Sequence, residues 1–181
     1  MSATSEKAEE QLSISYFSKM RGGAKPPARA SFTHIVISWV GGCLAIGVVA
    51  YLADITDATL MLGSFGATCV LVFGFPESPF SQPRNVIAGH FLSSLVGLLF
   101  LTLMGVHWWS MALAVGTAIA LMQLTRTVHP PAGSNPVIVM LTAPTWSFLL
   151  TPTLMGALLL VAVALFFNNV PKKRAYPTYW L

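Results

Sequence analysis

Charged residues are almost absent from the middle of this chain. Eight of the sixteen Lys, Arg, Asp and Glu residues lie in the first 29 positions, and three more lie at 172–174. Overall 55% of the residues are hydrophobic and 9% are charged, whereas a soluble domain carries roughly 25% charged residues. Long apolar stretches with charge at their ends predict an all-α integral membrane protein, with the lipid bilayer as its surroundings.

The apolar part of the sequence divides into six segments. The four long ones approach the roughly 20 residues that cross a bilayer, and they are 34–53, 86–106, 108–124 and 148–168. The two short ones begin with Gly, Pro and small polar residues, and they are 64–75 and 131–143. The chain crosses four times if the short segments are re-entrant and six times if both cross. We favour six crossings.

Basic residues flank this apolar region on both sides. The expected organisation is a polar tail over 1–31, one transmembrane domain over 32–170 and a basic, aromatic tail over 171–181. Lys and Arg before the first span and after the last predict that both tails are cytoplasmic. The net charge of +4 is then a feature of topology, and no nucleic-acid partner is expected. Residues 1–31 contain no apolar signal segment, so a bacterial inner membrane is the simplest location.

The two halves of the membrane region resemble each other weakly. Placing 63–100 over 130–167 aligns Gly66 with Gly133 and Gly89 with Gly156, and the small-residue breaks of the two short segments coincide. Chance similarity between apolar segments is the alternative. A true repeat of three spans plus three spans would be inverted, which is the layout of many transporters with a site at the repeat interface.

The segment TRTVHPPAGSNP, residues 125–136, interrupts the apolar pattern. Pro130 and Pro131 cannot continue a preceding helix, so a short helix is expected to begin near Pro131 or Ala132. Free backbone amides at its start, expected near Ala132 to Asn135, favour an anion. By the repeat, Gly66, Ala67 and Thr68 present a second set of amides. Together with further polar donors, these two helix starts predict an anion-selective constriction, and the donors are Ser64, Thr68, Ser134 and Asn135.

Several of these side chains have two interpretations. His129 is either a proton carrier or anion ligand, or a neutral histidine at a helix end. Asn135 either lines the pathway or satisfies the broken backbone. His90 should face the protein interior, because an imidazole is costly in lipid. Arg84 either draws anions to an entrance or only follows the positive-inside rule.

No metal or cofactor is expected. Cys43 and Cys69 both lie inside apolar runs, and we interpret them as buried packing residues. No close Cys/His cluster suggests a metal site.

Four motifs in this order resemble the HPP family of integral membrane proteins. They are GSFGATCVLVF at 63–73, SPFSQPRNVIAGH at 78–90, HPPAGSNP at 129–136 and RAYPTYW at 174–180. The resemblance implies four spans, and it implies transport of nitrite or a similar small anion, with which plant and cyanobacterial relatives are associated. The family motifs fall on Ser64, Gly66, Ala67, Gln82, Pro83, Arg84, Asn85, His129, Pro130, Pro131, Ala132 and Gly133. Ser134, Asn135 and Pro136 depart from the small residues common in relatives, so the substrate is the least secure implication.

Two functions follow from the sequence. The first is a transporter or channel for a small inorganic anion, nitrite by resemblance. The second is a membrane scaffold whose Gly and Pro motifs serve helix packing, for which Gly41, Gly42, Gly63 and Gly66 would allow close approach. An enzyme is not expected, because no nucleophile–base pair or carboxylate pair is visible. The small membrane region also predicts a homodimer or homotrimer.

Overall fold

The computed structural model describes residues 16–172 and 174–180. The chain divides into two units, Met1–Ala30 and Ser31–Leu181. In the described part of the first unit, a single helical turn, α2, covers Tyr16–Lys19. Much of the predicted polar tail 1–31 therefore lies outside the described residues. The second unit is all-helical wherever it is described.

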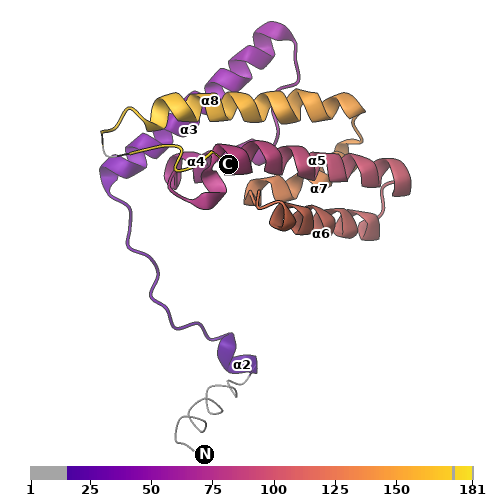
Figure 1. The fold of residues 1–181 in the computed structure, drawn as a ribbon, viewed down its shortest axis with the longest axis horizontal. Coiled ribbons are helices and arrows are strands. Elements are labelled where there is room, and N and C mark those ends of the chain that lie inside the picture. Colours follow the sequence, from indigo (N-terminus) through magenta and orange to yellow (C-terminus); the bar gives the residue numbers. More distant parts are fainter. Residues whose placement is uncertain (1–15, 173, 181) are drawn as a thin grey trace, which may run out of the picture. The chain divides into compact units, whose positions relative to one another are not determined.

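Six helices build the second unit within the described residues. They are α3 (Phe32–Thr56), α4 (Ser64–Gly74), α5 (Pro83–Met104), α6 (Trp108–Leu124), α7 (Asn135–Thr142) and α8 (Met155–Asn168). Short turns connect them, namely η1 (Pro79–Ser81), η2 (Pro130–Ser134), η3 (Trp146–Leu149) and η4 (Leu150–Leu154). Figure 1 shows α5, α6 and α8 running alongside one another, with α3 crossing α8 obliquely.

In the described part of the chain, three helical stretches are long and apolar enough to cross a membrane, and they are Phe32–Thr56, Pro83–Met104 and Trp146–Asn168. The fourth predicted span, α6, is an apolar helix of 17 residues and belongs to a shorter class. The expectation of four long spans is thus confirmed for three. Helix α4 has 11 residues, which is about 16 Å of helix and half of a bilayer core.

The start of α7 differs from the sequence prediction. The chain forms the tight turn η2 over Pro130–Ser134, and the α-helix begins at Asn135 instead of Pro131 or Ala132. Pro136 supplies the reason, because a proline is tolerated only in the first turn of a helix and would clash with the carbonyl four residues before it. The helix therefore restarts immediately before Pro136.

Hydrogen bonds gather the helix ends at one side of the unit, which we call the tail end. His34 near the start of α3 contacts the Gly74 carbonyl at the end of α4, with Nε2 2.8 Å from the oxygen. Arg84 at the start of α5 donates to the Thr125 carbonyl after α6, and Arg174 of the C-terminal segment donates to Asn168 at the end of α8. The starts of α3 and α5 thus lie with the ends of α4, α6 and α8.

The opposite end is formed by the loops after α3 and α7. Thr59 lines a small cavity of about 170 Å³ together with Pro144, Thr145, Ser147, Phe148, Thr151 and Pro152. The chain therefore alternates between the two ends, and the short segments containing α4 and α7 each take one passage.

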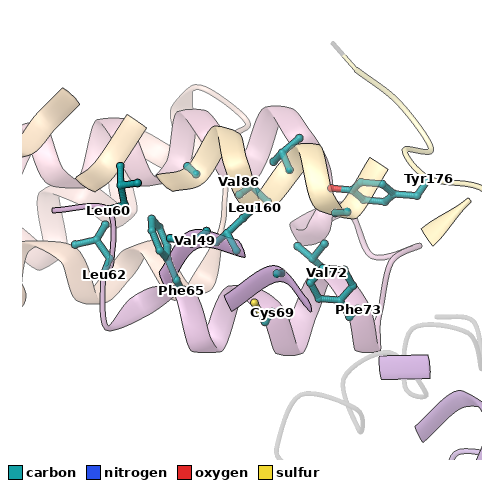
Figure 2. Close-up of a cluster of buried hydrophobic side chains, with 14 residues drawn as sticks. Val49, Leu60, Leu62, Phe65, Cys69, Val72, Phe73, Val86, Leu160 and Tyr176 are labelled. Carbon is teal, nitrogen blue, oxygen red and sulfur yellow. The ribbon is translucent and has the colours of Figure 1, made fainter. Parts of the chain in front are cut away.

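The apolar core lies between α3, α4 and α8, with Val86 of α5 at its edge (Figure 2). Phe65, Phe73 and Leu160 are almost fully buried there. Cys69 joins this core as predicted, whereas Cys43 is exposed on the outer face of α3 and the prediction for it is wrong. An apolar helix without an amphipathic pattern gives no sequence signal for which side chains face the core, so the exposure of Cys43 could not be predicted.

Close helix approach depends on particular glycines. A Cβ atom on Gly97 would lie 2.9 Å from Cα of Pro136, and one on Gly41 would lie 2.5 Å from the Phe73 ring. Gly42 and Gly66, also expected at helix contacts, face open space. The packing interpretation of the glycines therefore holds for Gly41 and fails for these two.

Gly97→Ala tests the contact between α5 and α7. The added methyl meets backbone in α7, so the helices must separate, and overpacking of this kind costs about 1–3 kcal/mol. Gly116→Ala in α6 is the control, since its Cβ would meet nothing within 4 Å. We expect thermal unfolding in detergent to occur at a lower temperature for Gly97→Ala only. Equal transition temperatures in the two variants would contradict the close contact.

Candidate functional site

Seven buried polar side chains meet in the interior of the second unit. We call them the central polar cluster, and they are Ser64, Thr68, His90, Ser94, His129, Asn135 and Thr153. Each is at most 3% exposed. They come from α4, α5, the residue before η2, α7 and η4. Polar groups removed from water in a membrane are costly unless they bind one another, so such a cluster is a candidate functional site.

Asn135, the first residue of α7, connects three elements. Its Oδ1 accepts a hydrogen bond of 2.8 Å from Oγ of Ser64, the first residue of α4. Its Nδ2 lies 3.0 Å from Oγ of Ser94 and 3.1 Å from Nδ1 of His90, both on α5. The Ser64–Asn135 bond brings the starts of α4 and α7 face to face, as the sequence predicted.

Thr68 lies between two histidines. Its Oγ1 is 2.9 Å from Nε2 of His90 and 3.0 Å from Nε2 of His129. The two imidazole rings have centroids 5.0 Å apart, and the Phe65 ring packs edge-on against His90. Both rings are fully buried, so the interior position predicted for His90 is what the structure shows.

His129 connects the central polar cluster to the tail end of the unit. Its Nδ1 lies 2.7 Å from the carbonyl oxygen of Phe80 in η1. Asn85 of α5 donates to the Val128 carbonyl, directly before His129. A Cβ on Gly89 would lie 2.7 Å from Cβ of His129, so only glycine lets the histidine approach α5 this closely.

Sequence reasoning missed Ser93, Ser94 and Thr153. Ser94 accepts from Thr153 Oγ1 at 3.1 Å, and Ser93 donates to the Ala132 carbonyl and holds η2 against α5. A signal was present, because His90, Ser93, Ser94 and Gly97 follow the i, i+3, i+4, i+7 spacing of one helix face. Thr153 has no such signal, since it reaches the cluster only after the break in helical backbone at Thr151.

Gln82, Arg84 and Asn85 lie outside the cluster. Gln82 donates to the Pro76 and Ser78 carbonyls and accepts from the Thr178 backbone amide. These residues hold the 125–128 loop and the C-terminal segment in place, so their observed contacts position the site without being part of it.

The C-terminal segment binds η1 on both sides of Phe80. Tyr176 donates to the Ser81 carbonyl and Tyr179 to the Pro79 carbonyl. Burial raises the pKa of the Tyr176 hydroxyl, which therefore stays protonated and keeps donating at physiological pH.

The remaining predicted residues lie beside the cluster. Pro131 and Ala132 are buried, and the others are partly or fully exposed. Ala67, Pro130, Pro131 and Ser134 line an open groove of about 490 Å³ together with Val70 and Leu71. Ala132 is buried behind it, and Gly66 and Gly133 have no neighbour at the position of a Cβ. The groove is apolar except for Ser134, whose Oγ donates to the Pro131 carbonyl.

The predicted row of free amides in η2 is wrong for two of its members. The Ala132 amide donates to the His129 carbonyl, and the Asn135 amide donates to the Ala132 carbonyl. The tight turn uses these groups internally, whereas an α-helix beginning at Pro131 would have left them free. In the part of the chain that the structure describes, every buried side-chain polar atom has a partner, and no three potential metal ligands come together.

The comparisons with known proteins agree with the motifs. The sequence profile of the HPP transmembrane region matches residues 27–177. The chain belongs to the HPP family. It is 37% identical over 179 residues to one transmembrane protein of Dictyostelium discoideum and 38% identical over 182 residues to a second. These alignments cover 92% of this chain but 58% and 64% of the two relatives. Their names describe them only as transmembrane proteins, and no solved structure matches the chain.

Asn135→Leu tests the cluster as a stabilising network. The substitution keeps the approximate size but leaves Ser64, Ser94 and His90 without a shared partner, and an unsatisfied buried polar group costs about 1–3 kcal/mol. We expect chemical unfolding in detergent at a lower denaturant concentration than for Thr142→Val, which removes an exposed hydroxyl bonded within its own helix. Equal midpoints would contradict a structural role for Asn135.

Proposed function

We propose that this HPP protein is a transporter for a small inorganic anion, and that the anion passes near the facing starts of α4 and α7. The observation that carries the proposal is the buried Ser64–Asn135 contact. It joins two helix N-termini in the interior of a membrane protein, where the dipoles of both favour negative charge. The central polar cluster also contains no carboxylate that would repel an anion.

The arrangement of elements supports an inverted repeat of α3–α5 and α6–α8. Helix α3 packs on α8 as α6 packs on α5, and α3 packs on α4 as α6 packs on α7. In the sequence alignment of the two halves, Thr68 corresponds to Asn135, and these two residues make the central bonds of the cluster.

Two aligned glycines make corresponding contacts. A Cβ on Gly89 would lie 3.1 Å from the Thr127 carbonyl, and one on Gly156 would lie 2.6 Å from the Leu60 carbonyl, which is the aligned position. Two halves that pack alike can exchange conformations, which is how inverted-repeat transporters alternate access. The route then opens when α4 separates from η2, between the outer groove and the cluster.

Nitrite is the proposed substrate because of the association of HPP relatives with nitrite transport. We further propose that the protein lies in a bacterial inner membrane with both termini cytoplasmic. Basic residues precede α3 and follow α8 in the sequence, and the start of α3 and the end of α8 both lie at the tail end, which supports this orientation. The small membrane region favours a homodimer or homotrimer with one pathway in each protomer.

A membrane scaffold is the second candidate, and one observation favours it. The polar side chains of the cluster are already bonded to one another within the described residues, which is what a purely structural network would require. A substitution that changes the charge of the central polar cluster without changing its shape distinguishes a transporter from a scaffold.

Asn135→Asp makes this change. The carboxylate is compatible with a helix N-terminus but repels an anion at the proposed route. We expect the rate of nitrite uptake into proteoliposomes to fall at least about tenfold. A tenfold decrease corresponds to about 1.4 kcal/mol of activation free energy, and repulsion between two buried like charges costs more than this. Thr142→Asp, exposed at the end of α7, should transport like the wild type. Saturable uptake unchanged by Asn135→Asp would move the route away from the cluster, and no uptake by the folded wild type would favour the scaffold.

Cysteine labelling tests the orientation. Thr145→Cys lies at the end formed by the α3 and α7 loops and Lys172→Cys at the tail end, and both positions are exposed. In intact bacterial cells an impermeant maleimide should label Thr145→Cys and leave Lys172→Cys unlabelled until the membrane is broken. The parent chain with Cys43 and Cys69 gives the background, and the reverse pattern would invert the topology.

A further inference from the structure

We propose that His90, Thr68 and His129 form a relay that carries one proton through the protein together with each anion. The inference rests on the proposed anion transport and adds its coupling ion. Its basis is a continuous chain of hydrogen bonds, from Asn135 through the two histidines to the Phe80 carbonyl. The four contacts measure 3.1, 2.9, 3.0 and 2.7 Å.

The partners at the ends determine where the protons lie. The Phe80 carbonyl can only accept, so Nδ1 of His129 carries a proton and its Nε2 is an acceptor. Asn135 Nδ2 also donates to the His90 carbonyl oxygen, which identifies it as the amide nitrogen. Nδ1 of His90 therefore accepts, and its Nε2 carries the proton.

The hydroxyl of Thr68 completes the direction. Its oxygen accepts from Nε2–H of His90, because a hydroxyl has one proton and two lone pairs. Its single proton goes to Nε2 of His129, which at 3.0 Å is closer than its other acceptor, the Ser64 carbonyl at 3.2 Å. All donors from Asn135 to His129 then point toward the tail end. Thr68 is the only link in the described structure that bonds to both imidazoles.

One proton can pass along this chain without leaving a charge behind. A proton binds Nδ1 of His90, and Nε2 of His90 gives its proton to Thr68. Thr68 gives its own proton to Nε2 of His129, and Nδ1 of His129 releases its proton to water that reaches it from the tail end. One proton enters and one leaves, and each imidazole ends neutral with its other nitrogen protonated.

The relay cannot repeat this step without a structural change. After the transfer, Nδ1 of His129 and the Phe80 carbonyl oxygen are two acceptors facing each other, and Nδ1–H of His90 faces the Asn135 amide as two donors. Both contacts are repulsive, so the rings or the elements that carry them must move before another proton passes. This requirement prevents a continuous leak and links one proton to one conformational cycle.

The surroundings explain why the proton travels with an anion. In the described structure, the hydrogen-bonding partners of both imidazoles are neutral, from α4, α7 and η1, and the Phe65 ring covers His90. A lone proton or a lone anion would be an unpaired charge in a low-dielectric site, whereas the pair is neutral. The proposed process is therefore electroneutral symport of one proton and one monoanion.

Proteoliposomes with an internal pH dye test the relay through Thr68→Val. This variant removes the hydroxyl that bonds both imidazoles, and Thr68→Ser restores it. Thr102→Val is the matched control, because its hydroxyl bonds only the Leu98 carbonyl within α5. We expect nitrite-dependent proton uptake to fall at least about a hundredfold in Thr68→Val, the scale of a lost proton-transfer group. Thr68→Ser and Thr102→Val should retain it.

The outcomes separate the relay from the anion route. If Thr68→Val takes up nitrite and its proton uptake is unchanged, the relay is overturned, whereas the proposed anion transport is still supported. Proton movement under an imposed membrane potential without nitrite would overturn the coupling of each proton to an anion, even if that movement depends on Thr68. Absence of both fluxes in the folded wild type would overturn both proposals.

A spectroscopic measurement does not depend on the folding of Thr68→Val. Nitrogen NMR of a chain carrying His34→Gln and His107→Gln leaves only His90 and His129 as imidazole signals. We expect a proton on Nε2 of one ring and on Nδ1 of the other. Two rings of the same tautomer would overturn the relay.

Discussion

The structure depends on one constraint, which is that polar groups inside a membrane protein must bind one another because lipid offers them nothing. The central polar cluster meets this requirement with short contacts between elements far apart in the sequence. Ser64 and Asn135, for example, are 71 positions apart and share a bond of 2.8 Å. Loss of one side chain leaves several others without a hydrogen-bond partner, so the cluster determines how α4, α5 and α7 pack together.

Helix α5 is the platform on which this arrangement is built. One face of α5 carries His90, Ser93, Ser94 and Gly97, and Gly89 lies next to this face. Gly89 and Gly97 allow residues 125–136 to approach α5 more closely than a side chain at either position would permit. The serines and the histidine then satisfy what the approaching segment brings. Close packing and polar bonding are thus two consequences of the same contact.

The polar cluster and the apolar groove beside it have different physical characters. The cluster is closed and bonded, whereas the groove lined by Ala67, Pro130, Pro131 and Ser134 is open. Only α4 and η2 separate them. A small movement between these elements would expose polar groups to the outside, which is the opening step of the proposed transport.

Most of the helices could be predicted from the sequence, because they depend on local pattern. Apolar runs placed five of the six within about four residues, and Pro130 marked where a helix must end. The run 148–168 includes the break at Thr151, so α8 begins only at Met155. That the two helix starts meet could be predicted because the two small-residue breaks align, whereas the Ser64–Asn135 pair became visible only in the structure. The start of α7 was misplaced, since the tight η2 turn depends on Pro136 acting with the two earlier prolines.

The sequence by itself determined that the chain is a membrane protein of the HPP type with two broken segments, since charge distribution and proline chemistry act locally. Only the tertiary structure decided which polar groups meet. It brought Thr68 between His90 and His129, recruited Ser94 and Thr153, and left Gln82 and Arg84 as supports. The physical reason is that hydrogen bonds between distant elements depend on helix rotation and crossing, which no local pattern encodes.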